Sequence, residues 1–171
     1  MFELKAIEMI AQNLKAAVDN GKDVVAREAM SQAQYIAGMG FSNVGLGIVH
    51  SMAHPLGAFY DTPHGVANAL LLPYVMEYNA EPPAAPKYIN IAKAMGVETA
   101  GMSEAEGVKA AIEAVKSLSL SIGIPQKLHE INVKEEDIPA LAVAAFNDVC
   151  TGGNPRPTSV EDIEVLYRKA F

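Results

Sequence analysis

The sequence is poor in cysteine, in basic residues and in long apolar runs, and each shortage excludes a class of protein. Its one cysteine, Cys150, has no partner for an internal disulfide, so we expect a reducing, cytoplasmic location. Only 13 residues are lysine or arginine, and the net charge is -7, which argues against nucleic-acid binding. No run is apolar for long enough to cross a membrane. The start of the chain also lacks the basic and apolar regions of a signal peptide.

The composition is otherwise that of a folded helical protein. Half of the residues are hydrophobic and 19% are charged, enough for a sizeable core. Apolar residues recur at helical spacing, such as Ile7 and Leu14 two turns apart, whereas sustained alternation is absent. Ser103 and Glu106 form a capping-box pattern at one predicted helix start. The sequence therefore predicts a single all-α, multi-helix domain over residues 1–171.

Turn and cap residues divide this domain into predicted helices. Pro55 and Gly57 are expected to end the third helix and leave a loop as far as Asp61. Thr62 is a candidate N-cap, with Pro63 at the first position of the fourth helix. The first predicted helix ends near residue 20, and the others cover about residues 23–40, 44–54, 64–78, 87–95, 103–122, 135–149 and 159–170.

Three of the four histidines lie close together in the sequence, at positions 50, 54 and 64. His50 and His54 are four residues apart on a predicted helix, so both imidazoles project from one face and could share a cation. The loop that follows can bring His64 back toward them. Imidazole is a common ligand of iron and zinc, which predicts a metal site; hydrogen-bonded, half-buried histidines are the alternative. His129 is predicted to be an ordinary surface residue.

Other catalytic motifs are absent from the chain. A zincin protease needs glutamate directly after the first histidine of its motif, and Ser51 occupies that position. Ser42 lies outside any GxSxG elbow, and Cys150 has no nucleophile signature around it. Gly45 and Gly47 do not extend into a GxGxxG fingerprint, and no strand precedes them. The sequence offers no serine, cysteine or dinucleotide motif to compete with the histidine segment.

Four stretches of the chain resemble a known enzyme family. Since the helices between these stretches also fit, the similarity extends over almost the whole chain. It is similar to the C-terminal helical half of the iron-containing (group III) alcohol dehydrogenases, whose fold is dehydroquinate synthase-like. The matching stretches are Gly45–Gly57 (GLGIVHSMAHPLG), Pro63–Asn68 (PHGVAN), Leu72–Pro73 and Cys150–Arg156 (CTGGNPR).

The resemblance implies a role for five residues. His50 and His64 become ligands of a divalent metal, Fe²⁺ or alternatively Zn²⁺. His54 becomes a catalytic residue beside the nicotinamide, in the proton path to the substrate oxygen, although helical spacing alone would pair it with His50 on the metal. Phe41 and Cys150 border the substrate channel, and Cys150 also lies on the cofactor side. The alternative interpretation of Phe41 is a core aromatic residue, and that of Cys150 is an inert buried thiol.

The resemblance also implies an activity and an incomplete site. The family transfers a hydride between NAD(P) and a small alcohol, diol or aldehyde, and its metal polarises the carbonyl group. Two further ligands, an aspartate and a histidine four residues later, come from an upstream helix, and this chain has no D-x-x-x-H pattern. The N-terminal nucleotide-binding domain is expected to be missing too. We therefore predict a metal-binding part of a dehydrogenase that is inactive alone and needs that domain as its partner.

A second hypothesis belongs to a different class of protein. The chain could be a helical interaction module, or a truncated fragment that associates with itself through an exposed apolar face. Its 50% apolar content and the apolar helix after His64 support this alternative. Under either hypothesis we expect a homo-oligomer.

Overall fold

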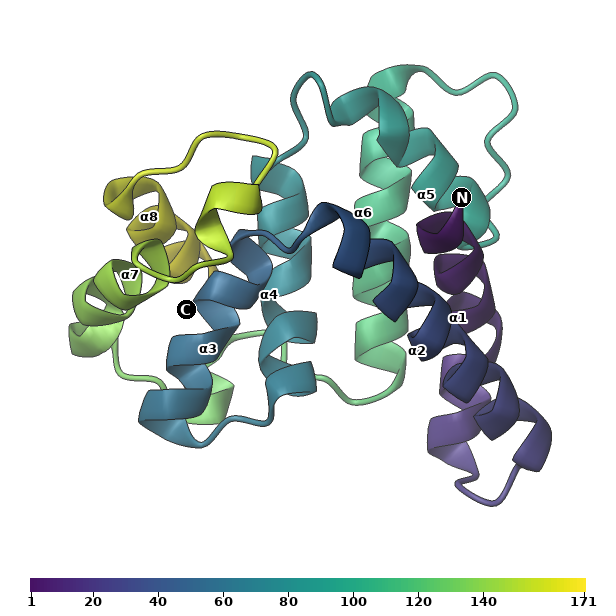
Figure 1. Cartoon of the computed structure of the whole chain (residues 1–171), viewed down its shortest axis with the longest axis horizontal. Coiled ribbons are helices and arrows are strands. Elements are labelled where there is room, and N and C mark those ends of the chain that lie inside the picture. Colours follow the sequence, from purple (N-terminus) through teal and green to yellow (C-terminus); the bar gives the residue numbers. More distant parts are fainter. The chain divides into compact units, whose positions relative to one another are not determined.

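The protein is built only of helices, and a computed structural model describes all of its residues, 1–171 (Figure 1). The predicted all-α fold class is confirmed. No helix is both long enough and apolar enough to span a membrane. The α-helices are α1 (Phe2–Asp19), α2 (Val24–Val44), α3 (Ile48–Tyr60), α4 (His64–Tyr78), α5 (Tyr88–Ala94), α6 (Glu104–Ser121), α7 (Ile138–Phe146) and α8 (Val160–Ala170). Short 3-10 helices are η1 (Ala85–Lys87), η2 (Leu128–Ile131), η3 (Glu135–Asp137) and η4 (Thr151–Gly153).

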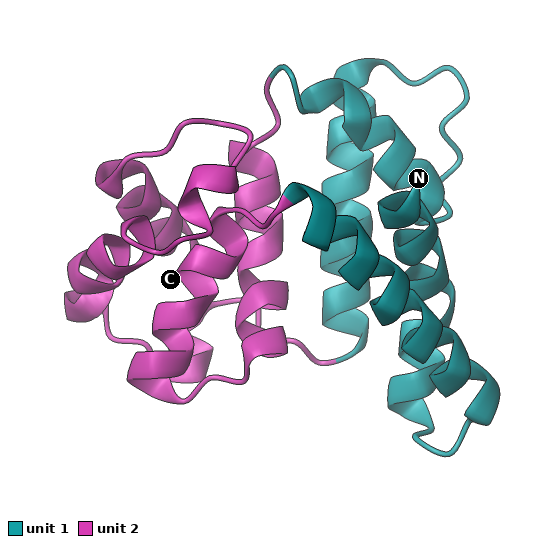
Figure 2. Ribbon diagram, in the orientation of Figure 1, with its two compact units in different colours: residues 1–44, 82–122 teal, residues 45–81, 123–171 magenta.

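The helices group into two compact units, and each unit is assembled from two separate segments of the chain (Figure 2). Unit 1 consists of Met1–Val44 and Pro82–Ile122, and it holds α1, α2, α5 and α6. Unit 2 consists of Gly45–Glu81 and Gly123–Phe171, and it holds α3, α4, α7 and α8. That residues 1–171 behave as one domain stays a prediction.

Small residues allow the helices of unit 1 to pack closely. Ala33 of α2 is fully buried, as is Ala111 of α6. A Cβ atom added at Gly107 of α6 would lie 2.9 Å from the Cβ of Ile89 on α5, inside van der Waals contact. Unit 1 is therefore held together by close backbone approach between its helices.

Larger side chains fill the core of unit 2. Met52 and Leu56 of α3 are fully buried against residues of the other three helices. Tyr167 of α8 is also fully buried, and its hydroxyl donates a hydrogen bond to the Met52 carbonyl oxygen at 2.6 Å. This bond satisfies the one polar group that the tyrosine brings into the core. Further core members include Ile48, Leu70, Leu71, Leu128, Ile138, Leu141, Ile163 and Leu166.

The predicted end of the third helix at Pro55 is wrong. Helix α3 continues through Pro55 as far as Tyr60, although proline has no N–H to donate to the preceding turn. Pro55 and its neighbour Leu56 are buried, so burial in the core offsets the cost of proline inside a helix. Asp61 then ends α3 in a left-handed conformation with φ 52°, which a short polar side chain tolerates.

Other predicted boundaries also shift. Thr62 does not cap α4: it is buried, its N–H donates to the Leu56 carbonyl oxygen at 3.3 Å, and Pro63 is the N-cap. Helix α2 runs past Gly40 to Val44, α3 begins at Ile48, and α7 begins only after η3. The capping box predicted at the start of α6 is confirmed, with both reciprocal hydrogen bonds present.

Candidate metal and proton-transfer site

Three histidine rings come together in unit 2. His50 lies in the first turn of α3, His54 one turn later, and His64 is the first residue of α4. Only residues 61–63 connect the two helices, so the start of α4 is held beside α3. The ring centroids of His50 and His64 are 5.4 Å apart, those of His54 and His64 5.6 Å, and those of His50 and His54 6.2 Å.

The spacing of His50 and His64 suits two ligands of one divalent ion. Two imidazoles bound to one metal through bonds of about 2.1 Å place their ring centroids roughly 5 Å apart, close to the separation found here. Burial lowers the pKa of His50 below its ordinary value, and the neighbouring His64 and His54 lower it further. A lowered pKa favours the neutral imidazole, which is the form that binds a metal.

Asn68 contacts His64 one turn further along α4. Its side-chain amide nitrogen donates to the His64 carbonyl oxygen at 2.9 Å and lies 3.2 Å from the His64 ring Nε2. Its amide oxygen is buried without a hydrogen-bond partner. The sequence assigns Asn68 no role beyond its place in the stretch Pro63–Asn68 that resembles the family. The structure makes it a neighbour of the predicted metal ligand.

Asp148, which sequence reasoning missed, is the main polar partner of His54. It follows the end of α7, and its Oδ2 lies 2.8 Å from the Nδ1 of His54. Its Oδ1 accepts a hydrogen bond from the backbone N–H of Cys150 at 2.8 Å. Burial acts to raise the pKa of Asp148, but the hydrogen bonds from Cys150 and His54 bring it below its ordinary value. The carboxylate is therefore ionised at neutral pH.

Two further side chains of unit 2, those of Ser51 and Thr151, place hydroxyl groups near Asp148. Ser51 is fully buried on α3, and its Oγ lies 3.3 Å from the Oδ1 of Asp148. The hydroxyl of Thr151 lies 2.8 Å from that of Ser51 and 2.8 Å from the carbonyl oxygen of Ala145. Ser51, which occupies the position where a zincin protease would need glutamate, therefore helps to support Asp148.

The segment after Cys150 is attached firmly to α3 and α4. A Cβ atom at Gly153 would lie 2.0 Å from the Leu46 carbonyl oxygen, so only glycine fits there. Asn79 and Asn154 pair through two amide hydrogen bonds of 2.9 Å. Arg156 donates to the carbonyl oxygen of Tyr78 at 2.8 Å, and its guanidinium carbon lies 4.1 Å from the centroid of the Tyr78 ring. These contacts hold the segment that presents Asp148 and Cys150.

Cys150 completes a second group of possible metal donors. The Nδ1 of His54, a carboxylate oxygen of Asp148 and the Sγ of Cys150 lie within 4.8 Å of one another. Burial and the nearby Asp148 raise the pKa of the Cys150 thiol, which opposes its deprotonation. The 2.8 Å contact between His54 and Asp148 is a hydrogen-bond distance, whereas two ligands of a tetrahedral ion lie about 3.3 Å apart. A proton fits between these two residues better than a metal ion does.

The remaining predicted residues lie elsewhere. Phe41 belongs to unit 1, where its side chain is 46% exposed, so it is no core residue there. His129 is exposed as predicted, and its Nδ1 lies 2.8 Å from the backbone oxygen of Phe171.

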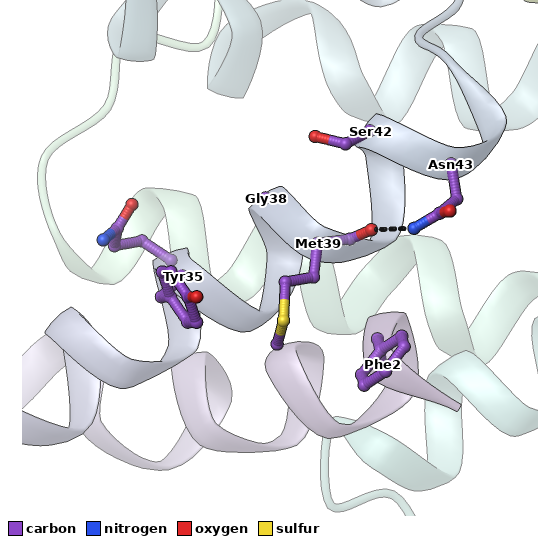
Figure 3. Close-up of a pocket in the computed structure, with 7 residues that line it drawn as sticks. Phe2, Tyr35, Gly38, Met39, Ser42 and Asn43 are labelled. Carbon is purple, nitrogen blue, oxygen red and sulfur yellow. Dashed lines mark hydrogen bonds between the residues drawn. The ribbon is translucent and has the colours of Figure 1, made fainter.

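Unit 1 also contains an open pocket of about 590 Å³ (Figure 3). Asn43 donates a hydrogen bond to the Met39 carbonyl oxygen at its edge. The pocket contains no histidine and no charged side chain, so its lining offers no set of ligands typical of a metal site. The residues that line it are Phe2, Gln34, Tyr35, Gly38, Met39, Ser42 and Asn43.

Comparison with known proteins identifies the family of the chain. The profile of the Fe-containing alcohol dehydrogenase family, C-terminal, matches residues 1–171. Lactaldehyde reductase of Escherichia coli K12 is 59% identical over 168 residues, covering 98% of this chain and 43% of that protein. The 1,3-propanediol dehydrogenase of Klebsiella pneumoniae is 46% identical over 170 residues, with the same coverage. A crystal structure of 1,3-propanediol oxidoreductase superimposes with a TM-score of 0.95 at 45% identity, covering 98% of this chain and 44% of that one.

The chain therefore belongs to the iron-containing alcohol dehydrogenase family and corresponds to its C-terminal helical domain. It spans less than half the length of the curated relatives that it matches. The resemblance drawn from the sequence is confirmed.

Proposed function

We propose that this chain is the metal-binding helical part of an NAD(P)-dependent alcohol dehydrogenase that acts on a short-chain alcohol, diol or aldehyde. The observation that carries the proposal is the convergence of His50, His54 and His64 in a member of this family. Three clustered imidazoles suit Fe²⁺ or Zn²⁺, and their chemistry does not distinguish the two ions.

Each residue of the cluster has a separate task in this proposal. His50 and His64 hold the metal, which when bound supplies Lewis-acid polarisation of the substrate oxygen. His54, whose Nδ1 lies 2.8 Å from a carboxylate oxygen of Asp148, carries a proton to or from the substrate oxygen. Cys150 borders the substrate and the cofactor. Phe41 borders the substrate channel, a role that rests on the family resemblance alone.

The chain alone is proposed to be inactive. Two imidazoles bind a divalent ion weakly, and structural or catalytic sites in proteins use three or four protein ligands. The aspartate and histidine of the family's other ligand pair, and the nucleotide-binding domain, would come from an upstream part that acts as the partner of this chain.

A chimaera tests the proposed function. This chain is fused to the N-terminal part of E. coli lactaldehyde reductase, the part that lies outside the matched 43%. We expect NAD(P)-dependent aldehyde reduction by the fusion and none by the chain alone, whose mass is verified as 18.2 kDa. Turnover by the chain alone would contradict the proposed incompleteness. A folded, metal-loaded fusion without turnover on any short aldehyde would contradict the proposed activity.

A helical interaction module remains the second candidate, favoured by the apolar surface of unit 1. Val24, Val25 and Val44 are each more than 70% exposed, and Tyr35 is 66% exposed. All four residues lie on α2, so this helix exposes apolar surface that would suit binding of a partner or a second copy of the chain. The chimaera separates the candidates: turnover by the fusion favours the enzyme part, whereas a fusion without turnover, together with a stable oligomer of the purified chain in light scattering, favours the module.

A further inference from the structure

The two oxygens of Asp148 are held in different ways. The Oδ1 atom accepts the Cys150 backbone N–H at 2.8 Å and faces the Ser51 hydroxyl at 3.3 Å. The Cys150 N–H can only donate a hydrogen bond, and Cys150 follows Asp148 by two residues in the same turn. This contact fixes the rotation of the carboxylate, so that the other oxygen, Oδ2, points at His54.

An ionised carboxylate can only accept hydrogen bonds. The 2.8 Å contact between Asp148 Oδ2 and His54 Nδ1 therefore places a proton on Nδ1. The hydrogen bonds that lower the pKa of Asp148 keep its carboxylate in this ionised form. A neutral imidazole has one N–H and one lone pair, so its lone pair is then on Nε2.

We propose that Asp148 is a positioning residue that holds His54 as the Nδ1–H tautomer and leaves Nε2 as the only atom of this ring able to accept a proton. Its side chain is 19% exposed and that of His54 is 40% exposed, so the hydrogen bond is shielded while the rest of the ring reaches solvent. The use of this Nε2 in proton transfer rests on the proposed function, whereas the tautomer does not.

The arrangement predicts an unusual effect of Asp148→Asn. The Cys150 N–H still requires an acceptor, so the amide oxygen of the new side chain takes the place of Oδ1. The amide NH₂ group then points at His54 Nδ1 and donates to it. The expected result is a reversed tautomer, with the proton on Nε2, rather than a simple loss of the contact.

Imidazole nitrogen chemical shifts test this inference in the 171-residue chain. Histidine is isotope-labelled, and spectra are recorded well above the ordinary histidine pKa of about 6.5. His54→Gln identifies the signals of His54. We expect a protonated Nδ1 and a bare Nε2 in the wild type, and the opposite pattern in Asp148→Asn.

Asp137→Asn is the matched control, because Asp137 is another carboxylate of unit 2 and accepts a hydrogen bond from Tyr60 instead. It should leave the His54 pattern unchanged. A wild-type chain with the proton on Nε2 would overturn the inference without any variant, so a failure of Asp148→Asn to fold leaves it testable. A folded Asp148→Asn chain with the wild-type pattern would overturn it too.

The chimaera separates this inference from the proposed function. If His54 Nε2 is in the proton path, Asp148→Asn should lower kcat about 100-fold while metal content stays unchanged. A reversed tautomer with undiminished kcat supports the positioning by Asp148 and contradicts the proton-transfer role of His54. An unchanged tautomer contradicts the positioning, whatever the activity.

Discussion

The two units of the chain bury different kinds of side chain. Unit 1 buries mostly alanine and glycine, and several of its large apolar side chains remain exposed. Its ion pairs, such as Lys15 with Asp19 at 2.6 Å, join neighbouring turns of one helix. Unit 2 buries leucine, isoleucine and tyrosine, and the hydrogen bond from Tyr167 to Met52 joins residues 115 positions apart.

This difference suits the position of the candidate site in unit 2. Orienting His54 within a fraction of an ångström needs a support that cannot move, and a core of large side chains tied by long-range hydrogen bonds provides one. Exposed apolar helices suit a surface that is covered by another body. We expect substitutions in unit 2 to alter the site, and substitutions in unit 1 to alter association.

The largest effect is expected from Gly153→Ala in unit 2. Its new Cβ atom would meet the Leu46 carbonyl oxygen at 2.0 Å, and a backbone atom cannot move aside as a flexible side chain can. We expect a loss of about 3 kcal/mol in the free energy of unfolding, measured with urea. Gly152→Ala, next to it but with no atom within 4 Å, should change stability by less than about 0.5 kcal/mol. Equal effects of the two would show that this loop is not held against α3.

The corresponding change in unit 1 should be milder. Gly107→Ala would bring a Cβ atom within 2.9 Å of the Ile89 Cβ, but alanine also favours the helical conformation. The two contributions oppose each other, so we expect a net loss of about 1.5 kcal/mol in the same measurement. A loss as large as that of Gly153→Ala would mean that unit 1 is packed as rigidly as unit 2.

Matched helix caps test whether the units unfold together. Ser103 caps α6 in unit 1 and Ser159 caps α8 in unit 2, each within a capping box. Replacement of either serine by alanine should cost about 1 kcal/mol. Amide hydrogen exchange then reports where stability is lost. If the units are independent, each variant speeds exchange in its own unit only; faster exchange throughout the chain in both variants would contradict independence.

The smallest effect concerns acid stability. A hydrogen bond from the Ser159 backbone, followed by one from its hydroxyl, holds the pKa of Asp162 below its ordinary value. The stabilisation by this carboxylate is therefore present above the ordinary pKa near 3.8 and is lost as the pH falls through the lower value of the folded state. Asp162→Asn should remove about 0.5 kcal/mol at neutral pH and flatten the acid limb of the stability curve. Glu161→Gln is the control: it removes the same charge one residue earlier without removing a hydrogen bond of the Ser159 capping box, so it should cost less stability at neutral pH.

Local patterns in the sequence predicted most helices, the Ser103 capping box and the segment with three histidines. They failed at Pro55, because its burial in the core of unit 2 is a tertiary effect that outweighs the helix-breaking tendency of proline. They also failed to predict Asp148, which lies 94 residues from His54. An aspartate two residues before Cys150 carries no local signal of its partner, and only the packing of the folded chain brings the two side chains together.

The central claim is that His50 and His64 bind the metal while His54 serves another role beside it. Metal content of the chimaera, measured by elemental analysis after purification with iron or zinc, tests this claim most directly. We expect one metal per chain in the wild type and in His54→Ala, and a loss of metal in His50→Ala and in His64→Ala. Retention of metal in His50→Ala, or its loss in His54→Ala alone, would contradict the assignment.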